Sequence, residues 1–241
     1  MRVPRIFTQN TLVTGQTVEL EAQASHHLSK VLRMQNDAAL ILFNNQGGEF
    51  DANIVSLSKK SVSVIIGEHR SDNRQSPLPV HLGIAMSKGD RMDWVMQKAT
   101  ELGATEITPL YTERTELKLK ADRAEKKHSH WQNIIISACE QCQRNLLPQL
   151  HAPTPLLDWL NNSQAEKKLV LHHRNTKKLN PADSPNSAAI LIGPEGGLSD
   201  HEIEQALAQG FNALSLGPRV LRTETAPLAA LTLLQSLWGD I

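Results

Sequence analysis

Residues 188–209 read AAILIGPEGGLSDHEIEQALAQ, and this stretch decides the fold. An apolar run typical of a buried strand ends at Ile192, a Gly-Pro-Glu-Gly-Gly loop follows, and a helix is predicted after it. Ser199 and Glu202 have the spacing of a capping box, and Gly210 is placed to end the helix. Ligands of open α/β sheets lie beyond the carboxyl ends of the strands, where glycines let backbone groups approach them. The stretch therefore predicts a ligand-binding loop, although an ordinary tight strand-to-helix turn has the same pattern.

A second Gly-Pro loop follows the next predicted strand, Ala213–Leu216. It reads GPRVLRTETAP over residues 217–227 and leads into an apolar helix predicted over residues 228–238. Right-handed crossovers place the ends of parallel strands at one edge of a sheet, so we expect two neighbouring strands whose loops together enclose a flat heterocycle. Neither loop matches G-x-G-x-x-G, and the sequence contains no P-loop motif. A dinucleotide-binding fold and a P-loop are therefore disfavoured.

Strand and helix patterns alternate through the C-terminal part of the chain. Strands are predicted at residues 80–85, 106–110, 169–172 and 188–192, and helices at 91–102, 121–144 and 155–160. This alternation predicts an α/β domain with a parallel sheet.

The N-terminal part has a different pattern, with short β-type runs at residues 5–8, 17–20, 38–43, 50–57 and 61–68. Gln46-Gly47-Gly48 predicts a hairpin turn, and residues 25–34 predict one short helix capped by Ser25. The polar, proline-bearing segment RSDNRQSPLP at 70–79 has the composition of a linker. We therefore expect two domains, residues 1–72 and residues 73–241.

Composition sets limits on the kind of protein. Of 241 residues, 40% are hydrophobic and 21% are charged, which is typical of a soluble globular chain. The longest apolar runs, 38–43 and 62–66, are strand-sized, so no membrane span is expected. The first twenty residues lack the apolar run of a secretory leader, and two cysteines cannot staple a chain of this length, so a cytoplasmic protein is expected. With 25 basic and 25 acidic residues, any nucleic-acid binding must depend on local patches.

The two loops carry a specific resemblance. IGPEGGLS (192–199) and LGPRVLRTETA (216–226) resemble the paired cofactor loops of the SPOUT class of S-adenosylmethionine-dependent RNA methyltransferases. Within that class the chain is most similar to the RsmE family, which methylates N3 of one uridine in 16S ribosomal RNA. The resemblance extends to PRIF (4–7), HHL (26–28), VLR (31–33), SKGDRM (87–92), QKATELG (97–103), and Glu140-Gln141 with Arg144. The chain departs from the family pattern at Asn36-Asp37, where Gly-Asp is usual, and at Cys139 and Cys142, where Ala and Ser are more frequent.

The resemblance implies a fold and partners. It implies a small PUA-like β-barrel domain that binds RNA, followed by a SPOUT methyltransferase domain with a deep trefoil knot. It also implies a homodimer, S-adenosyl-L-methionine bound in the knot, and the 16S RNA of the small ribosomal subunit as partner. No metal and no membrane association are expected.

Most candidate site residues belong to the same loops. Transfer of a methyl group to a uridine nitrogen requires loss of the N3 proton and stabilisation of charge on the flanking carbonyl oxygens. Arg222 is expected to stabilise that charge, and Glu195 or Glu140 to orient the base or accept its proton; the sequence does not choose between these two. The expected cofactor-binding residues are Leu171, His172, Ile192, Gly193, Pro194, Glu195, Gly196, Gly197, Leu216, Gly217, Val220, Leu221, Arg222, Thr223, Thr225 and Ala226. Thr223 and Thr225 have an alternative role as caps of the last helix.

Basic residues near the small domain are the candidates for RNA contact, since phosphate contacts supply position and affinity. They are Arg2, Arg5, His26, His27, Lys30 and Arg33, with Lys88, Arg91, Arg114 and Arg144 extending the track. A solvated basic face is the alternative. Cys139 and Cys142 have C-x-x-C spacing but no second pair, which favours two inert thiols, and His172-His173 is interpreted as a strand end beside the pocket.

Two rival functions remain open from the sequence. One is a non-catalytic RNA-binding or ribosome-assembly protein that uses the glycine loops only structurally. The other is an enzyme of the same fold that acts on transfer RNA. Uptake of S-adenosylmethionine separates the first from an enzyme, and nucleoside analysis of the RNA separates the second.

Overall fold

The computed structural model describes residues 3–58, 61–116, 121–172 and 179–241. The chain divides into two compact units, which are described separately. The first comprises Met1–Gln75 and Cys139–Leu147, and the second Ser76–Ala138 and Pro148–Ile241. The first unit thus contains a second segment, residues 139–147, that is distant in sequence. The single predicted boundary after residue 72 assigned this segment to the second domain.

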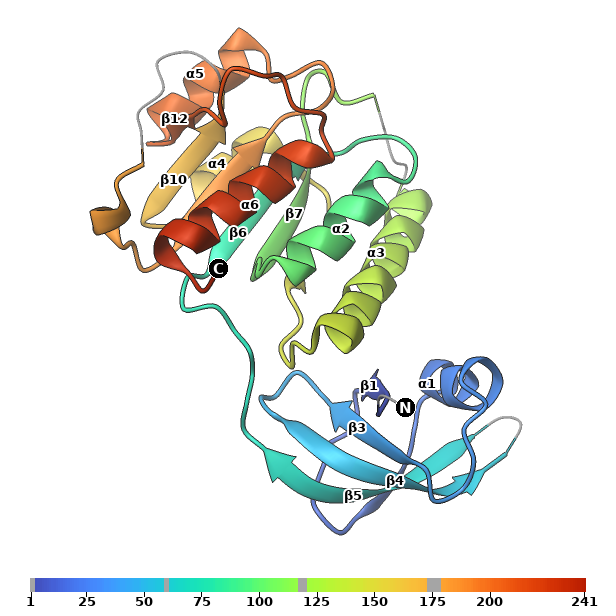
Figure 1. Ribbon diagram of the computed structural model, residues 1–241. Coiled ribbons are helices and arrows are strands. Elements are labelled where there is room, and N and C mark those ends of the chain that lie inside the picture. The colour runs from blue at the N-terminus through green and yellow to red at the C-terminus, as the bar shows by residue number, and fades with distance from the viewer. Residues whose placement is uncertain (1–2, 59–60, 117–120, 173–178) are drawn as a thin grey trace. The chain divides into compact units, whose positions relative to one another are not determined.

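The first unit is built on a mixed five-stranded sheet in the order β1-β3-β4-β5-β2 (Figure 1). Its strands are β1 (Arg5–Phe7), β2 (Thr17–Glu19), β3 (Ala39–Phe43), β4 (Glu49–Leu57) and β5 (Val62–Arg70). The β1–β3 pair is parallel and the other pairs are antiparallel. Alternate residues of β4 and β5, such as Ile54 and Val64, are buried in an apolar core, as the period of a strand requires. The predicted turn joins β3 to β4, with Gly47 and Gly48 at positive φ.

The short helix of the first unit begins earlier than predicted. Helix α1 (Ala22–His26) continues into the π-helical turn η1 (His27–Val31). Ser25 is therefore not a helix cap, and that prediction is wrong. Its buried hydroxyl instead donates to the Leu20 carbonyl (3.0 Å) and accepts from the Val62 amide (3.1 Å), tying the helix to the sheet.

The first unit contains a buried ion cluster. The Arg5 guanidinium contacts Glu49 and Asn145, and Arg70 and Arg74 also reach the Glu49 carboxylate, at 3.1 and 3.2 Å. Burial acts to raise the pKa of Glu49, but the hydrogen bonds and charge of Arg5, with Arg74 and Asn145, outweigh it and hold this pKa below 4.5. Glu49 is therefore ionised and serves as counterion to several arginines.

The second unit contains a seven-stranded sheet in the order β12-β10-β11-β6-β7-β8, with β9 also pairing β7, and every pair is parallel. Its strands are β6 (Val80–Ala85), β7 (Glu106–Tyr111), β8 (Gln149–Leu150), β9 (Thr154–Pro155), β10 (Lys167–Leu171), β11 (Ala188–Ile192) and β12 (Asn212–Leu214). The prediction of a parallel α/β sheet is confirmed. The expectation that the two loop-bearing strands are neighbours is wrong, because β10 lies between β11 and β12.

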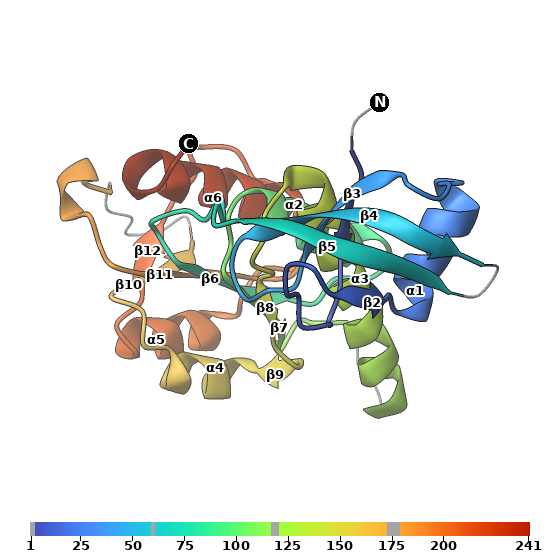
Figure 2. The same cartoon turned by 90° about the horizontal axis from the view of Figure 1, so that it is seen from below.

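Helices cover both faces of this sheet (Figure 2). On one face lie α2 (Arg91–Glu101) and α6 (Thr225–Trp238), and on the other α4 (Leu156–Asn162) and α5 (Asp200–Ala208); α3 (Ala121–Cys142) and a short 3-10 turn, Pro181–Asp183, complete the elements. Trp159 of α4 packs so closely on β6 that a Cβ added at Gly83 would lie 2.5 Å from its ring. Among the described residues, no helix is both long and apolar enough to span a membrane.

Candidate functional site

A cavity of about 520 Å³ lies at the carboxyl edge of the second unit's sheet. Its walls come from the segments that follow β10, β11 and β12 and from the start of α6. The two Gly-Pro loops thus line one cavity although their strands are not adjacent, and Leu171 and His172 stand between them at the end of β10. The His172 amide donates to the Leu214 carbonyl (2.9 Å), which ties the β10 segment to β12.

The loop after β11 turns back tightly on itself. The Gly197 amide donates to the Pro194 carbonyl (2.8 Å), and Gly197 has a φ of +68°, which favours glycine. A Cβ at Gly193 would lie only 2.9 Å from the Leu198 nitrogen. The loop leads directly into α5, whose predicted capping box between Ser199 and Glu202 is confirmed. Close backbone approach therefore requires glycine at position 193, and the positive φ favours it at position 197.

The loop after β12 is the more open wall. Gly217 has a φ of +98°, the Ser215 hydroxyl donates to its carbonyl (3.2 Å), and Val220 is fully exposed. The backbone amides of Thr225 and Ala226 both donate to the Arg222 carbonyl (2.9 Å), which starts α6. Neither Thr223 nor Thr225 caps this helix, since its N-cap is Glu224 and no side chain makes a capping hydrogen bond. That alternative reading of the two threonines is wrong.

Charged side chains gather beside the first loop. Glu195 lines the cavity and is paired with Arg91, whose Nε lies 3.8 Å from the Glu224 carboxylate. Arg114 holds the same loop from its backbone, donating to the Gly196 carbonyl at 2.7 Å. These contacts position the loop, and they leave Glu195 half-exposed at the edge of the cavity.

The cavity contains most of the predicted cofactor residues. Those that line it are Leu171, His172, Ile192, Gly193, Pro194, Glu195, Gly196, Gly197, Leu216, Gly217, Val220, Leu221, Thr223 and Ala226. Arg222 and Thr225 are exposed and do not line it, although the residues on both sides of Arg222 do. Sequence reasoning missed Leu198, Leu214, Ser215, Pro218 and Arg219, which adjoin the predicted residues and carried no separate motif.

Glu140 has a different environment from Glu195. It belongs to the first unit, where its carboxylate accepts the Phe7 amide (3.0 Å), and it is not among the residues lining the cavity. Burial raises the pKa of Glu140, against the opposing effects of the Phe7 hydrogen bond and Arg5. On the same turn of α3, a hydrogen bond with Cys142 and burial raise the pKa of Cys139, so its thiol stays protonated.

The predicted RNA contacts divide by exposure. His26, Lys30 and Arg33 are exposed around α1 and η1, and His27 is half-buried, whereas Arg2 lies outside the described residues. Arg5 and Arg144 are buried within the first unit, which removes them from a surface that phosphates reach, so their expected role in RNA contact is not supported by the structure.

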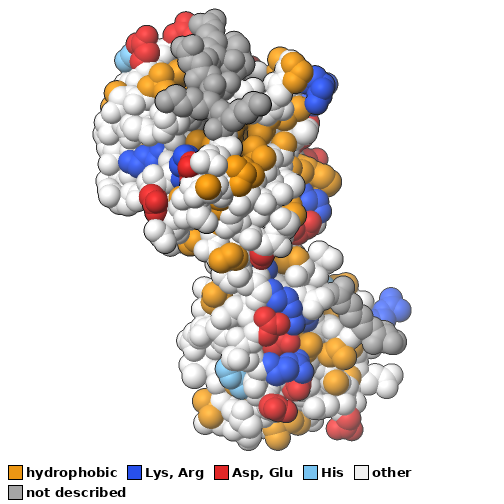
Figure 3. Space-filling model, turned by 60° about the vertical axis from the view of Figure 1, so that its left-hand side comes forward, with side chains coloured by type: hydrophobic (Ala, Val, Ile, Leu, Met, Phe, Trp, Pro, Cys, Tyr) orange, Lys and Arg blue, Asp and Glu red, His pale blue; other side chains and the backbone are white. Residues whose placement is uncertain are grey.

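The other basic candidates, on the second unit, are engaged locally: Lys88 with Glu116 (2.6 Å), Arg91 with Glu195, and Arg114 with the loop backbone. On the first unit, basic and acidic side chains alternate on the face that Figure 3 shows. Ion pairs such as Arg70–Asp51 (2.8 Å) belong to that unit, so its charge is mixed rather than uniformly basic.

Comparisons with known proteins agree with this geometry. Residues 74–235 match the RNA methyltransferase domain family, and residues 20–67 match the RNA methyltransferase PUA domain family. The ribosomal RNA small subunit methyltransferase E of Buchnera aphidicola subsp. Schizaphis graminum is 39% identical over 100% of this chain and 98% of its own length. The protein of the same description from Bacillus subtilis is 33% identical over 94% of this chain and 92% of its own.

Solved structures show the same fold with a ligand. A methyltransferase of Legionella pneumophila in complex with the cofactor SAM is 45% identical, with a TM-score of 0.97 over 100% of both chains. The ribosomal RNA small subunit methyltransferase E of Neisseria gonorrhoeae bound to S-adenosyl methionine is 38% identical, with a TM-score of 0.93 over 100% of both chains. From its two matched domains and its full-length relatives, the chain belongs to the ribosomal RNA small subunit methyltransferase E family of RNA methyltransferases.

Proposed function

We propose that this protein is an S-adenosyl-L-methionine-dependent methyltransferase that methylates N3 of a uridine in the 16S ribosomal RNA of the small subunit. The observation that carries the proposal is the single cavity formed by both Gly-Pro loops at the carboxyl edge of the parallel sheet. Relatives of 38% and 45% identity that share the fold over the full chain are described as bound to the same methyl donor. The N3 position and the uridine come from the family resemblance of the loops.

The cavity suits the methyl donor chemically. Leu171, Ile192 and Leu198 supply apolar surface for a flat adenine ring, and the glycine-rich loop supplies backbone donors and acceptors for its polar edge. The Glu195 carboxylate at the edge of the cavity complements the positive sulfonium of the donor. When bound, the donor supplies an activated methyl group.

The chain's own groups must handle the proton and the developing charge. As the methyl carbon bonds to N3, its bond to sulfur breaks, the electron pair stays on sulfur, and the N3 proton passes to a base. We place Arg222, between the cavity-lining residues Leu221 and Thr223, as the group that stabilises negative charge on the uracil oxygens. Glu195 lines the cavity and is the candidate for the base, although it would have to share its carboxylate with Arg91. Glu140, the other carboxylate that the sequence offered, does not line the cavity.

The test is methylation of 16S RNA, free and in small subunits, followed by mass spectrometry of the nucleosides. We expect 3-methyluridine with the wild-type protein and its loss from RNA of cells lacking the protein. Methylation of transfer RNA alone would refute the ribosomal assignment. Calorimetry with S-adenosylmethionine should show saturable uptake, and no uptake would favour the RNA-binding alternative.

Arg222→Ala tests the role given to that side chain, with Arg222→Lys retaining the charge. Arg123→Ala is the matched control, because Arg123 is an exposed arginine on α3 that does not line the cavity. We expect kcat to fall for Arg222→Ala while uptake of the methyl donor and Arg123→Ala activity stay near wild type. Full activity in folded Arg222→Ala would remove Arg222 from the mechanism.

The homodimer, the trefoil knot and a cytoplasmic location are further parts of the proposal, and they rest on the resemblance and on composition. Light scattering on the purified protein tests the dimer: a mass near twice the 26.7 kDa of one chain supports it, and a monomer at micromolar concentration refutes it.

A further inference from the structure

A second cavity, of about 560 Å³, lies at the opposite edge of the same parallel sheet. It is lined by residues at the amino ends of strands, including His81 of β6, Glu106 of β7 and Ala188 of β11. Strand β11 connects the two cavities, from Ala188 to Ile192, a span of roughly 13 Å at about 3.3 Å per residue. This cavity is therefore separate from the one that the methyltransferase chemistry uses.

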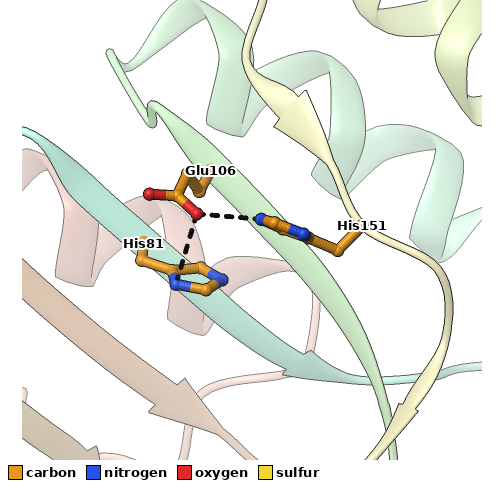
Figure 4. Close-up of side chains that lie close together, drawn as sticks. All are labelled: His81, Glu106 and His151. Atoms are coloured by element: carbon orange, nitrogen blue, oxygen red, sulfur yellow. Dashed lines mark hydrogen bonds and ion pairs between the residues drawn. The ribbon is translucent and has the colours of Figure 1, made fainter. Parts of the chain in front are cut away.

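Three side chains of metal-binding types, two histidines and one glutamate, converge in it (Figure 4). His81 pairs directly with Glu106 in the register of β6 and β7, and His151 follows β8, the other neighbour of β7. The His151 amide donates to the Ile107 carbonyl (2.9 Å), which fixes the backbone beside Glu106. Parallel pairing thus brings together residues far apart in sequence, with all three on regular or hydrogen-bonded backbone.

The donor atoms of the three side chains surround one point. Glu106 Oε2 lies 2.8 Å from His151 Nε2 and 3.8 Å from His81 Nδ1, and one donor atom from each residue lies within 4.8 Å of the others. Bonds of about 2.0–2.2 Å to Zn²⁺ place tetrahedral donor atoms roughly 3.3–3.6 Å apart, inside this range. Two imidazoles and one carboxylate are also a donor set that first-row divalent ions prefer.

We propose that His81, Glu106 and His151 form a binding site for a first-row divalent transition-metal ion such as Zn²⁺. Three protein ligands leave a further coordination position, which would face the cavity and take water. All three side chains are partly exposed, so an ion reaches them from solvent. Among the described residues, this is the cluster in which His and carboxylate donors meet in a group of three.

The surroundings of His81 make a specific demand on this site. Its Nε2 lies 2.7 Å from Thr108 Oγ1, a suitable acceptor for the ring N–H of a ligating histidine. Trp159 Nε1, which only donates, also lies 3.1 Å from that nitrogen and favours the tautomer with the proton on Nδ1. Ion binding through Nδ1 moves that proton and breaks the Trp159 hydrogen bond. We therefore expect Trp159 to weaken metal affinity. If the three side chains served only to hold the fold together, removing the Trp159 hydrogen bond would not increase ion binding.

Ser163 supplies an independent sign that this cavity takes a polar occupant. Ser163 lines the cavity, and only 6% of its surface is exposed. Its hydroxyl has no hydrogen-bond partner among the described residues. A buried hydroxyl normally has a partner, so Ser163 indicates that this cavity takes a polar occupant, such as the water that a bound ion would hold.

No metal site was predicted from the sequence, because neither the two cysteines nor the His172-His173 pair has a further ligand at a short spacing. Residues 81, 106 and 151 have no short spacing that marks a metal site. Their proximity depends on the pairing of β6, β7 and β8, which a local pattern does not contain.

The test uses full-length protein freed of metal with a chelator. Titration with Co²⁺ should give the visible absorption of a four- or five-coordinate site with one ion per chain, and Zn²⁺ should displace it. Glu106→Gln and His151→Asn should each weaken binding at least about tenfold, in line with the effect of losing metal-site groups. Trp159→Phe should tighten it. Circular dichroism verifies that each variant is folded.

His130→Asn is the matched control, since His130 also pairs with a carboxylate, Asp93 at 2.7 Å, but belongs to no group of three metal-binding side chains within the described part of the chain. It should bind Co²⁺ as the wild type does. Equal loss in His130→Asn would identify adventitious binding to surface histidines and overturn the proposal. Wild-type affinity no greater than that of folded His151→Asn would overturn it as well.

Discussion

Replacing Glu49 by Gln should destabilise the first unit strongly. The side chains of Glu49 and Arg5 are 5% and 4% exposed, and Glu49 accepts from Arg5, Arg74 and Asn145 and pairs with Arg70. The amide keeps the shape but leaves the buried Arg5 charge without a counterion. Breaking a buried pair by removing one partner costs about 3–5 kcal/mol, a large part of the roughly 5–15 kcal/mol that stabilises a typical protein. At about 4 °C or more per kcal/mol for a unit of this size, the transition should fall by at least about 12 °C.

The assay can separate the two units. All four tryptophans, at positions 94, 131, 159 and 238, belong to the second unit, so tryptophan fluorescence reports on that unit, while calorimetry and circular dichroism report on both. We expect Glu49→Gln to lower the temperature of the calorimetric transition of the first unit, and to leave the transition seen by tryptophan fluorescence unchanged. Asp51→Asn is the control, because the Asp51 carboxylate is half-exposed and its pair with Arg70 is worth at most about 1 kcal/mol.

The pH dependence has a definite sign. Because the pKa of Glu49 in the folded state lies below its ordinary value of 4.5, the stability from its charge is present above that value. It is lost as the pH falls through the lower folded pKa, so the wild type and Glu49→Gln should converge in acid. The double variant Arg5→Met/Glu49→Leu removes both charges and should recover most of the lost stability. A loss under about 1 kcal/mol in Glu49→Gln, or a double variant as unstable as the single one, would refute the assignment of a buried ion pair.

Three further predictions concern the cavity, the RNA surface and a buried carboxyl group. Gly193→Ala should weaken the binding of S-adenosylmethionine measured by calorimetry, because the added Cβ would lie 2.9 Å from the Leu198 nitrogen and shift the loop that lines the cavity. An affinity equal to that of the wild type would contradict this close approach. Lys30→Ala/Arg33→Ala should lower the slope of log affinity for single-stranded RNA against log salt by about 1.4, if each side chain neutralises one phosphate, and an unchanged slope would remove both from the RNA surface. Glu140→Gln should raise the unfolding temperature at pH 7, because the raised pKa of Glu140 means that its ionised form is disfavoured in the folded state. This gain in stability should vanish below pH 4.5, the ordinary pKa of the group, where the carboxyl is protonated in both states. A loss of stability at pH 7 would show that the charge is needed.

Local sequence signals predicted those parts of the fold that neighbouring residues determine. The capping box of Ser199 and Glu202 is present, and Gly103 and Gly210 follow helix ends with φ of +83° and +82°, a conformation that side chains disfavour. The burial of Arg5 was not predictable in this way. Its partners Glu49 and Asn145 lie 44 and 140 positions away along the chain, and only the folded unit brings them together.

The candidate cavity shows the same division. Glycine and proline marked both loops, because the loops need unusual backbone conformations that few residues adopt. The order of the strands was not encoded in those loops, and the insertion of β10 between β11 and β12 depends on pairing along the whole sheet. Ser25 was misplaced for a related reason: its hydroxyl serves the sheet through Val62 rather than the start of the helix.

The position of β12 links occupancy of the methyl-donor cavity to the order of the sheet. This strand is three residues long, forms the edge of the sheet and pairs with β10 through three residue pairs, Leu169–Asn212 to Leu171–Leu214. Short edge strands open at low free energy, and a ligand that touches their ends closes them by mass action. We therefore expect this wall of the cavity to open more readily in the empty protein, and the amide hydrogens of residues 212–216 to exchange more slowly with solvent deuterium as the donor concentration rises.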